Sequence, residues 1–445
     1  MKNNSMLEGN IWKTMFKLSW PTMIGMIFHT AFNVIDTIFV GRISAEAIAA
    51  VSIAFPFIFF FFAFAQGVGT GTTSLIARSL GAKDKETAQR AAKHSLLIGV
   101  VFWVIFGMLG FFLASSLFPF FGANETIMPM AKSYTYMIFS GFIFTFLFFS
   151  ASSIFRGFGD MKTPMYVMIF SVVVNIVLDA ILIFGWGFIP RMEVFGAALA
   201  TVIARAVSCV VILSLLFSKK SKLKINTHSF TFDWKIIKDI FKVGIPSSLN
   251  MIVMSLGAMF YTKMASLVSP LAIAMYGIVS KLESIAFLPV IGISVATVTL
   301  VGHNFGAKNF KRIKEIAVKS SIISFIFMSI MGFIFWFFPE FWISIFSNNP
   351  EVLSLGRDYI KIIFWSFGFV GLGIIIGSLF QGLGRGTPTL MITLTRALAG
   401  LPVAIVLWFV MGINGVWVGS VISILVGAVV GFIWLKLSFK KLMVY

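Results

Sequence analysis

IAAVSIAFPFIFFFFAFA, residues 48–65 of the 445-residue chain, is an apolar run that contains one serine and no charge. A helix of about 20 such residues crosses the hydrocarbon core of a bilayer. Similar runs recur along the whole chain, in which 59% of the residues are hydrophobic and only 11% are charged. Soluble domains carry roughly a quarter charged residues. The composition therefore indicates an all-α polytopic membrane protein, and it excludes a soluble globular protein, a disordered chain and a disulfide scaffold.

Twelve apolar runs bounded by polar clusters predict twelve transmembrane helices. Their expected ranges are 13–40, 48–78, 94–118, 129–155, 164–187, 194–217, 237–262, 272–301, 320–344, 355–380, 388–411 and 415–437. If the amino terminus is cytoplasmic, the cytoplasmic face carries 26 of the 35 Lys and Arg residues. This positive-inside asymmetry predicts a multi-pass protein of the cell (inner or plasma) membrane with both termini in the cytoplasm. We attribute the net charge of +19 to orientation and contact with anionic membrane lipids, and we expect no nucleic-acid partner.

The chain contains an internal repeat with a constant offset between its copies. The segment 16–21 (FKLSWP) recurs as 241–246 (FKVGIP), and 80–83 (LGAK) recurs as 305–308 (FGAK). The same offset relates 155–159 to 380–384. Six helices per half predict two six-helix bundles related by a pseudo-twofold axis along the membrane normal, as in parallel-repeat transporters. The expected organisation is an N-lobe over residues 1–217, a polar cytoplasmic linker over 218–235 and a C-lobe over 236–445. Rocking of two such lobes would open a central cleft to either side of the membrane in turn.

Carboxylates inside the apolar runs are the strongest functional signal, because a charge within the bilayer is costly. Asp36 shares a helical stripe with His29 and Asn33, and Asp179 shares a face with Asn175 four residues earlier. Two buried carboxylates that face one hydrated cavity suit uptake and release of a proton. Together with the Asn175 amide and the Thr201 hydroxyl, the same oxygens suit a small hard cation such as Na⁺. The alternative is that Asp36 ends its helix and makes a structural ion pair near the surface.

The second half of the chain is less specific. Glu283 and Lys281 are two residues apart on the eighth helix and point to different sides, so they are not expected to pair directly. Arg396 is an available partner for Glu283, and a structural pair and a gating or substrate contact are equally consistent with the sequence. The wider set of candidate proton-relay or substrate contacts is His29, Asn33, Asn250, Tyr261, Lys281, Glu283 and Arg396.

Enzyme chemistry finds no support in the sequence. The glycines at 67, 69 and 71 follow no strand and lack dinucleotide-binding spacing, so they predict close helix contact instead. Phosphate-binding loops, catalytic triads and His-rich clusters are missing from the sequence, and the single cysteine, Cys209, cannot form an intrachain disulfide. The first apolar run lacks a small-residue cleavage pattern and predicts a retained span rather than a signal peptide. We therefore expect no enzymatic activity, no cofactor and no metal beyond a transported Na⁺, and we expect an ion gradient to supply the energy.

Three segments together resemble the multidrug and toxic compound extrusion (MATE) transporters over essentially the whole chain. They are 33–41 (NVIDTIFVG), 156–164 (RGFGDMKTP) and 175–179 (NIVLD), and GAALAT at 196–201 also fits. The aspartates resemble the amino-lobe carboxylates of the prokaryotic branch related to the DNA-damage-inducible proteins. This resemblance implies that Asp36, Asn175, Asp179 and Thr201 form a proton or sodium coupling site. Other branches use an acidic residue in the seventh helix, where this chain offers only Asn250, and this departure favours the amino lobe.

The sequence thus predicts a secondary active antiporter that exports amphipathic, cationic organic compounds in exchange for H⁺ or Na⁺ by alternating access. Its expected partners are small-molecule substrates and membrane lipids, with no obligate protein partner. A lipid-linked oligosaccharide or lipid flippase of the same superfamily is the first alternative, although only Arg205, Lys281 and Arg396 are available within the spans to meet a pyrophosphate. A receptor or scaffold without transport is the second alternative.

Overall fold

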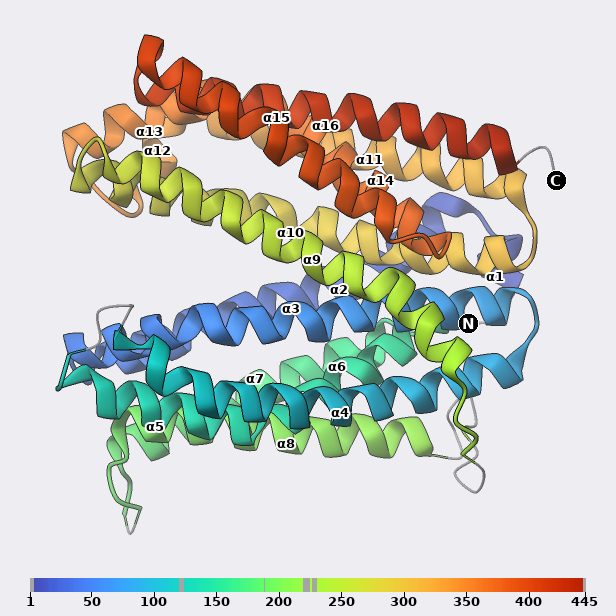
Figure 1. Cartoon of the computed structure of the whole chain (residues 1–445), viewed down its shortest axis with the longest axis horizontal. Coiled ribbons are helices and arrows are strands. Elements are labelled where there is room, and N and C mark those ends of the chain that lie inside the picture. Colours follow the sequence, from blue (N-terminus) through green and yellow to red (C-terminus); the bar gives the residue numbers. More distant parts are fainter. Residues whose placement is uncertain (1–3, 120–123, 188, 219–224, 226–229, 443–445) are drawn as a thin grey trace. The chain divides into compact units, whose positions relative to one another are not determined.

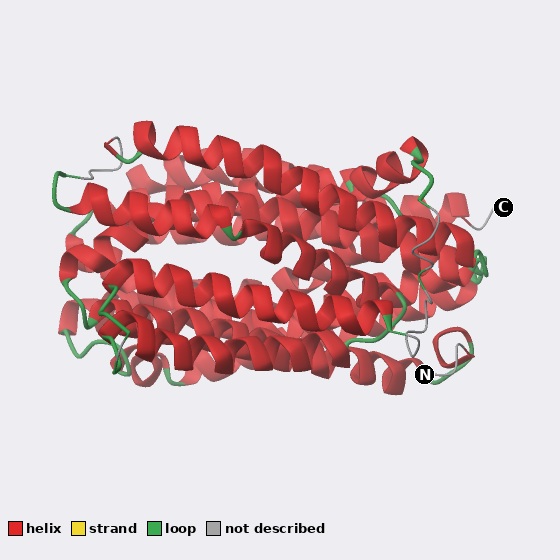
Figure 2. Cartoon of the chain, turned by 90° about the horizontal axis from the view of Figure 1, so that it is seen from below, coloured by secondary structure: helices red, strands yellow, loops and turns green. Residues whose placement is uncertain are grey.

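The structure, a computed structural model, describes residues 4–119, 124–187, 189–218, 225 and 230–442. This part of the chain is mostly helical (Figure 2). Its only β feature is an isolated antiparallel bridge between Trp186 and Ile189. Within it, eleven helices are long and apolar enough to cross a membrane, and the pair α5 (Ile127–Ser140) and α6 (Phe142–Gly157), bent by 45°, makes a twelfth span. The predicted all-α membrane fold is confirmed.

The chain forms two compact units, which we call the N-unit (residues 21–244) and the C-unit (residues 1–20 and 245–445). Besides α5 and α6, the N-unit contains α3 (Ala45–Gly81), α4 (Lys85–Leu117), α7 (Lys162–Phe184) and α8 (Glu193–Phe217) (Figure 1). In this unit α3 packs against α4, α5 and α6, and α7 packs against α8. Many phenylalanine rings fill the core between these helices, among them Phe61, Phe142 and Phe146.

The C-unit repeats this arrangement with more breaks in its helices. It contains α1 (Asn4–Leu7), α10 (Pro270–Gly306), α11 (Phe310–Phe337), α12 (Pro339–Ser344), α13 (Pro350–Ile363), a 3₁₀ turn (Phe364–Ser366), α14 (Phe367–Gly382), α15 (Thr387–Met411) and α16 (Ile413–Leu442). Here α10 packs against α11, α13 and α14, and α15 packs along α16. The fully buried indole of Trp417 lies in the core of this unit.

Two helices belong partly to each unit. Helix α2 (Ile11–Gly41) leaves the C-unit at Trp20 and continues in the N-unit from Pro21, and α9 (Trp234–Ser266) makes the reverse change between Gly244 and Ile245. The packing boundaries therefore fall inside helices, at or next to a proline, whereas the expected lobe boundaries at 217 and 236 follow the polar linker. Most of that linker, residues 219–224 and 226–229, lies outside the described residues.

Local structure repeats in the same register as the sequence. The offset that relates 80–83 to 305–308 also relates both ends of α3 to those of α10, and both ends of α6 to those of α14. Ser44 and Ser269 cap α3 and α10 by accepting hydrogen bonds from the backbone amides three residues later, each at 3.1 Å. Lys83 and Lys308, which follow the two helices, both have positive φ angles, 62° and 57°. The repeated sequences therefore form the same caps and turns in both units.

Small residues in α3 permit close helix contact, as predicted. A side chain at Gly69 would collide with the Ser153 hydroxyl of α6, and one at Gly71 would collide with the backbone carbonyl of Ile240 in α9. The second contact holds the first turns of α9 against the N-unit. The neighbouring residue Thr72 adds a buried hydroxyl pair with Ser95, which joins α3 to α4 at 2.8 Å.

Candidate functional site

The predicted acidic site lies inside the N-unit, where α2 supplies Asp36 and α7 supplies Asn175 and Asp179. Asn175 and Asp179 are fully buried, and Asp36 is 9% exposed. The two residues on α7 lie one turn apart, and the Asn175 amide donates a weak hydrogen bond of 3.4 Å to Asp179 Oδ1. Asp36 lies close enough to Asp179 for an electrostatic interaction. The structure thus brings together three of the four residues predicted for the coupling site.

Three oxygens at this site have no hydrogen-bond partner among the described residues: Asp36 Oδ1, Asn175 Oδ1 and Asp179 Oδ2. A buried polar atom without a partner costs free energy, so such atoms call for an explanation. A proton on a carboxylate or a small hard cation bound by carboxylate and amide oxygens would satisfy them. These oxygens therefore fit either a proton or a small hard cation such as Na⁺.

Thr201 is the predicted site residue that the structure does not join to the others. It lies half-buried on α8 and makes no hydrogen bond with Asp36, Asn175 or Asp179. Helix α8 nevertheless approaches α7 closely, because a side chain on Gly196 would lie 2.5 Å from the Leu182 carbonyl oxygen. The role of Thr201 in the coupling site stays a prediction.

The stripe of polar residues on α2 meets three different environments. Asp36 is buried, Asn33 is exposed and its side chain makes no hydrogen bond, and His29 is half-buried. The His29 ring stacks on Phe32 and Phe62 with centroids 6.4 Å and 6.0 Å away. His29 therefore packs against two aromatic rings. Among the described residues, no hydrogen bond connects His29 to Asp36.

Two further polar residues of the N-unit were not predicted as parts of the site. Tyr134 of α5 is 6% exposed and lies within electrostatic range of both Asp36 and Asp179. Arg205 of α8 is 8% exposed, and its guanidinium lies over the rings of Phe32 (5.3 Å) and Phe148 (5.9 Å). Among the described residues, Arg205 has no carboxylate partner. Tyrosine gives no polarity signal in an apolar run, and the aromatic neighbours of Arg205 come from helices distant in sequence.

The C-unit has an aromatic cluster around Glu283 of α10. The Tyr359 hydroxyl of α13 donates a hydrogen bond of 2.8 Å to Glu283 Oε1. Tyr359 also packs edge-to-face on Trp417, at 4.8 Å between centroids, and Tyr276 stacks on the same indole at 5.6 Å. Tyr261 reaches this indole at 6.1 Å. A cavity of about 10 Å³ beside Glu283 and Tyr359 has room for about one water molecule.

The other polar residues predicted for the second half do not join an ionic site. Arg396 makes no ion pair with Glu283; its side chain packs on Gly427, and it is in electrostatic contact with Tyr261. Lys281 is exposed, with its ammonium 5.9 Å from the Phe346 ring centroid, and as predicted it does not pair with Glu283. Asn250 of α9 makes only a weak contact of 3.8 Å with Met254 Sδ, and its side-chain oxygen has no partner among the described residues.

The fold consists of two repeated helical units, and one of them holds buried carboxylates that have no ion-pair partner among the described residues. This combination is typical of polytopic membrane transporters. The sequence pattern of the MatE family matches residues 21–181 and 246–406, two segments of equal length at the offset of the repeat. The chain belongs to the MatE family.

Similar proteins cover almost the whole chain. This chain is 29% identical over 418 residues to a probable multidrug resistance protein NorM of Thermotoga maritima, and the alignment covers 93% of this chain and 89% of the relative. It is 27% identical over 416 residues to an FAD transporter of Shewanella oneidensis, covering 93% and 91%. A transporter of the MOP superfamily from Pyrococcus furiosus has a solved structure that superimposes with a TM-score of 0.92 at 29% identity, over 100% of this chain and 99% of that one.

Proposed function

We propose that this protein is a multidrug efflux antiporter, which exports amphipathic, cationic organic compounds in exchange for H⁺ or Na⁺ by alternating access. The observation that carries the proposal is the set of three buried oxygens without partners on Asp36, Asn175 and Asp179. The description of the Thermotoga relative as a probable multidrug resistance protein supports the export of drugs.

The geometry suggests how a coupling ion and a substrate exchange. With a proton or Na⁺ bound, the charges of Asp36 and Asp179 are reduced, and the buried site no longer carries two uncompensated negative charges. When the ion leaves, the two carboxylates repel each other and attract a cation. A cationic substrate and the coupling ion then favour different states of the same bundle, which is the differential affinity that exchange requires.

We place the protein in the cell membrane with both termini in the cytoplasm, because the Lys and Arg residues concentrate on the face that carries the termini. Labelling of single cysteines introduced at Lys83, in the turn after α3, and at the exposed Glu125, just before α5, checks this orientation, after replacement of the native, buried Cys209. An impermeant reagent applied to intact cells should label only the Glu125 position. Labelling at Lys83 alone would reverse the assignment.

Transport in proteoliposomes tests the coupling site. We expect uptake or release of a fluorescent organic cation to respond to an imposed pH or sodium gradient in the wild type. Asp36→Asn and Asp179→Asn should each abolish this response and leave the protein folded and inserted. Glu340→Gln is the matched control, because Glu340 makes only an exposed ion pair of 3.0 Å with Arg357.

The outcomes separate the alternatives. Gradient-driven transport that persists in both Asn variants would show that the coupling site lies elsewhere. The pH gradient and the sodium gradient are imposed separately, and the gradient that drives flux identifies the coupling ion. An anionic flavin is included as a second cargo, because one relative is described as an FAD transporter. Flux of the flavin without flux of the organic cation would overturn the proposed substrate class.

A further inference from the structure

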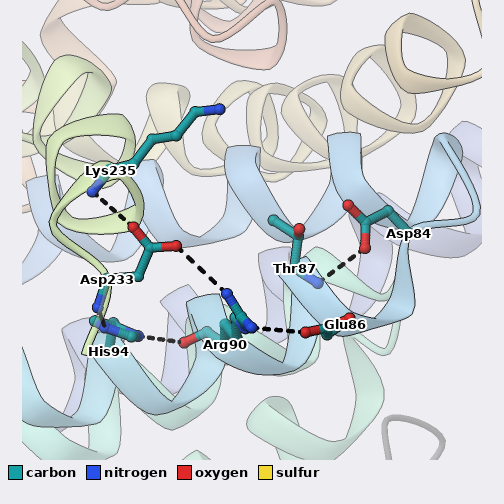
Figure 3. A network of polar contacts seen from close by, with 7 residues as sticks. All are labelled: Asp84, Glu86, Thr87, Arg90, His94, Asp233 and Lys235. Carbon is teal, nitrogen blue, oxygen red and sulfur yellow. Dashed lines mark hydrogen bonds and ion pairs between the residues drawn. The ribbon is translucent and has the colours of Figure 1, made fainter. Parts of the chain in front are cut away.

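The start of α9 is fastened to α4 by a small polar network (Figure 3). Asp233 caps α9 by accepting a hydrogen bond of 2.9 Å from the Lys235 amide. The backbone amide of Asp233 in turn donates a hydrogen bond of 2.8 Å to His94 Nε2 on α4. The second carboxylate oxygen of Asp233 lies 3.6 Å from the Arg90 guanidinium, which also pairs with Glu86 at 2.7 Å. We call these contacts of Asp233 with His94 and Arg90 the α9 strap.

The two hydrogen bonds of His94 define the state of its ring. Nδ1 lies 2.8 Å from the carbonyl oxygen of Arg90, which can only accept, so Nδ1 carries the hydrogen. Nε2 accepts from the Asp233 amide, so Nε2 must have a free lone pair. The imidazole in the strap is therefore neutral, as the Nδ1–H tautomer. The side chain is fully buried, and the rings of Phe230 and Phe232 cover it with centroids 5.1 Å and 5.8 Å away.

A proton on Nε2 is incompatible with this arrangement, because two N–H groups would then face each other across the bond. We propose that His94 is a proton-operated latch: when it takes up a proton, Asp233 and with it the start of α9 are released from α4. Imidazole is the side chain whose ordinary titration falls within the physiological range. Departure of the strap also removes Phe230 and Phe232 from the ring and gives the charged form access to water.

Some of the charged groups around His94 favour a protonated ring and others oppose it. On α4 itself, Arg90 disfavours a positive ring, while Glu86 favours it. From the start of α9, the Asp233 carboxylate favours a positive ring and Lys235 opposes it. Helices α3 and α6 also pack against α4, and their last turns carry two more cations, Arg78, which interacts with Asp239 of α9, and Arg156. These charges have opposite effects on the charge of the His94 ring, and none of them alone determines it. The protonation of His94 and the release of the strap are therefore coupled mainly through the hydrogen bond from the Asp233 amide.

The α9 strap lies at the start of a helix that continues into the second unit. Helix α9 continues from the N-unit into the C-unit after Gly244, so the strap holds the N-unit end of a helix that both units share. The other shared helix, α2, follows a comparable fastening in the C-unit, where Arg312 donates hydrogen bonds to the carbonyls of Met6 and Gly9. Arginine keeps its charge at physiological pH. Of these two fastenings, the structure therefore makes the α9 strap the pH-sensitive one.

Hydrogen exchange on the purified full-length protein tests the latch without substrate, so the result does not depend on the proposed transport activity. The readout is the protection factor of the peptide over 230–242 between pH 7 and pH 5. Because only the open state accepts the proton, we expect this protection to fall by up to about tenfold per pH unit in the lower part of the range. Nitrogen spectra of labelled histidine, assigned by substitution among the four residues His29, His94, His228 and His303, should show the Nδ1–H tautomer at pH 7 for His94.

Three variants separate the latch from a passive contact. His94→Gln offers an acceptor that cannot titrate, so protection should be independent of pH. His94→Phe keeps an aromatic ring but loses the acceptor, so protection of 230–242 should be low at every pH. Asp233→Asn removes the carboxylate and the ion pair with Arg90 but keeps the amide, so it should retain the pH dependence. Protection of α7 serves as the measure of folding in every variant.

Two results would overturn the proposal. One is unchanged protection of 230–242 in the wild type while the spectra show that His94 has become protonated. The other is a pH dependence in His94→Gln as large as in the wild type, which would assign the titration to Asp233 or Glu86 instead.

Discussion

Replacing Gly71 by alanine tests how closely α3 must approach α9. A methyl group at this position would collide with the carbonyl oxygen of Ile240 and would lie only 3.0 Å from its carbonyl carbon and 3.1 Å from the Gly244 nitrogen. All three atoms belong to the backbone of a helix, so no side-chain rotation relieves the collision. Alanine must therefore separate the two helices or distort one of them.

The expected cost follows from this geometry. Extra methyl groups in a well-packed interior destabilise proteins by about 1–3 kcal/mol, and contact with rigid backbone puts Gly71→Ala near the upper end. A loss of about 3 kcal/mol corresponds to a change of roughly 100-fold in the unfolding equilibrium. Gly257→Ala is the matched control, because Gly257 lies in α9 with no other atom within 4 Å of the added carbon. There, alanine should stabilise the helix by up to about 1 kcal/mol.

Reversible unfolding in mixed micelles, followed by tryptophan fluorescence during titration with a denaturing detergent, measures both variants against the wild type. We expect Gly71→Ala to unfold at a clearly lower detergent fraction and Gly257→Ala to unfold at the same or a higher one. Equal stability of the two variants would refute the reasoning, because it would mean that α3 and the start of α9 are not held in close backbone contact.

Two further predictions concern single hydrogen bonds. Tyr359→Phe should cost about 1–3 kcal/mol, because it removes the donor to Glu283, and the cost should shrink in a Glu283→Gln background; a double-mutant cycle that shows simple additivity would contradict the contact. Asp84→Ala should cost about 0.5 kcal/mol at neutral pH, after allowance for solvent screening, because it removes the cap on α4 (Figure 3). Hydrogen bonds from the Thr87 side chain and backbone lower the pKa of Asp84, so this contribution is present above the ordinary aspartate range and is lost as the pH falls through the lower folded value. Stability curves of Asp84→Ala and wild type should therefore converge in acid, below the ordinary aspartate pKa; a gap that stays constant as the pH falls into that range would contradict the cap.

The fold was predictable from the sequence because the bilayer leaves few alternatives. Backbone polar groups in the hydrocarbon core must be paired internally, so each apolar run had to form a helix. The sequence repeat then predicted equivalent structure in the two halves, and the matching caps at Ser44 and Ser269 are one instance of it. The exchange of helix ends between units was not predictable, because it depends on tertiary packing on either side of Pro21 and Gly244 and leaves no change in hydropathy.

The candidate site was predictable only where a charged or strongly polar residue interrupts an apolar run. Asp36 and Asp179 do so, and the spacing of Asn175 predicted its contact with Asp179. Tyr134 and Tyr359 could not be recognised in this way, since tyrosine is common in membrane helices. Their polar partners lie on segments that are distant in the sequence. For Arg396, charge alone left a pair with Glu283 as one possibility, and the structure instead packs the arginine side chain against Gly427.

The shared helices α2 and α9 have a consequence for the origin of the chain. The leading segment of each repeat packs with the bundle of the other repeat, so a single ancestral copy would have lacked a packing partner for its own first segment. Two identical copies would have supplied the missing parts to each other by reciprocal exchange. Duplication and fusion of the gene would join such a homodimer into one polypeptide. Severing the chain in the linker should accordingly yield two fragments that reassemble when produced together and that fail to fold when produced alone.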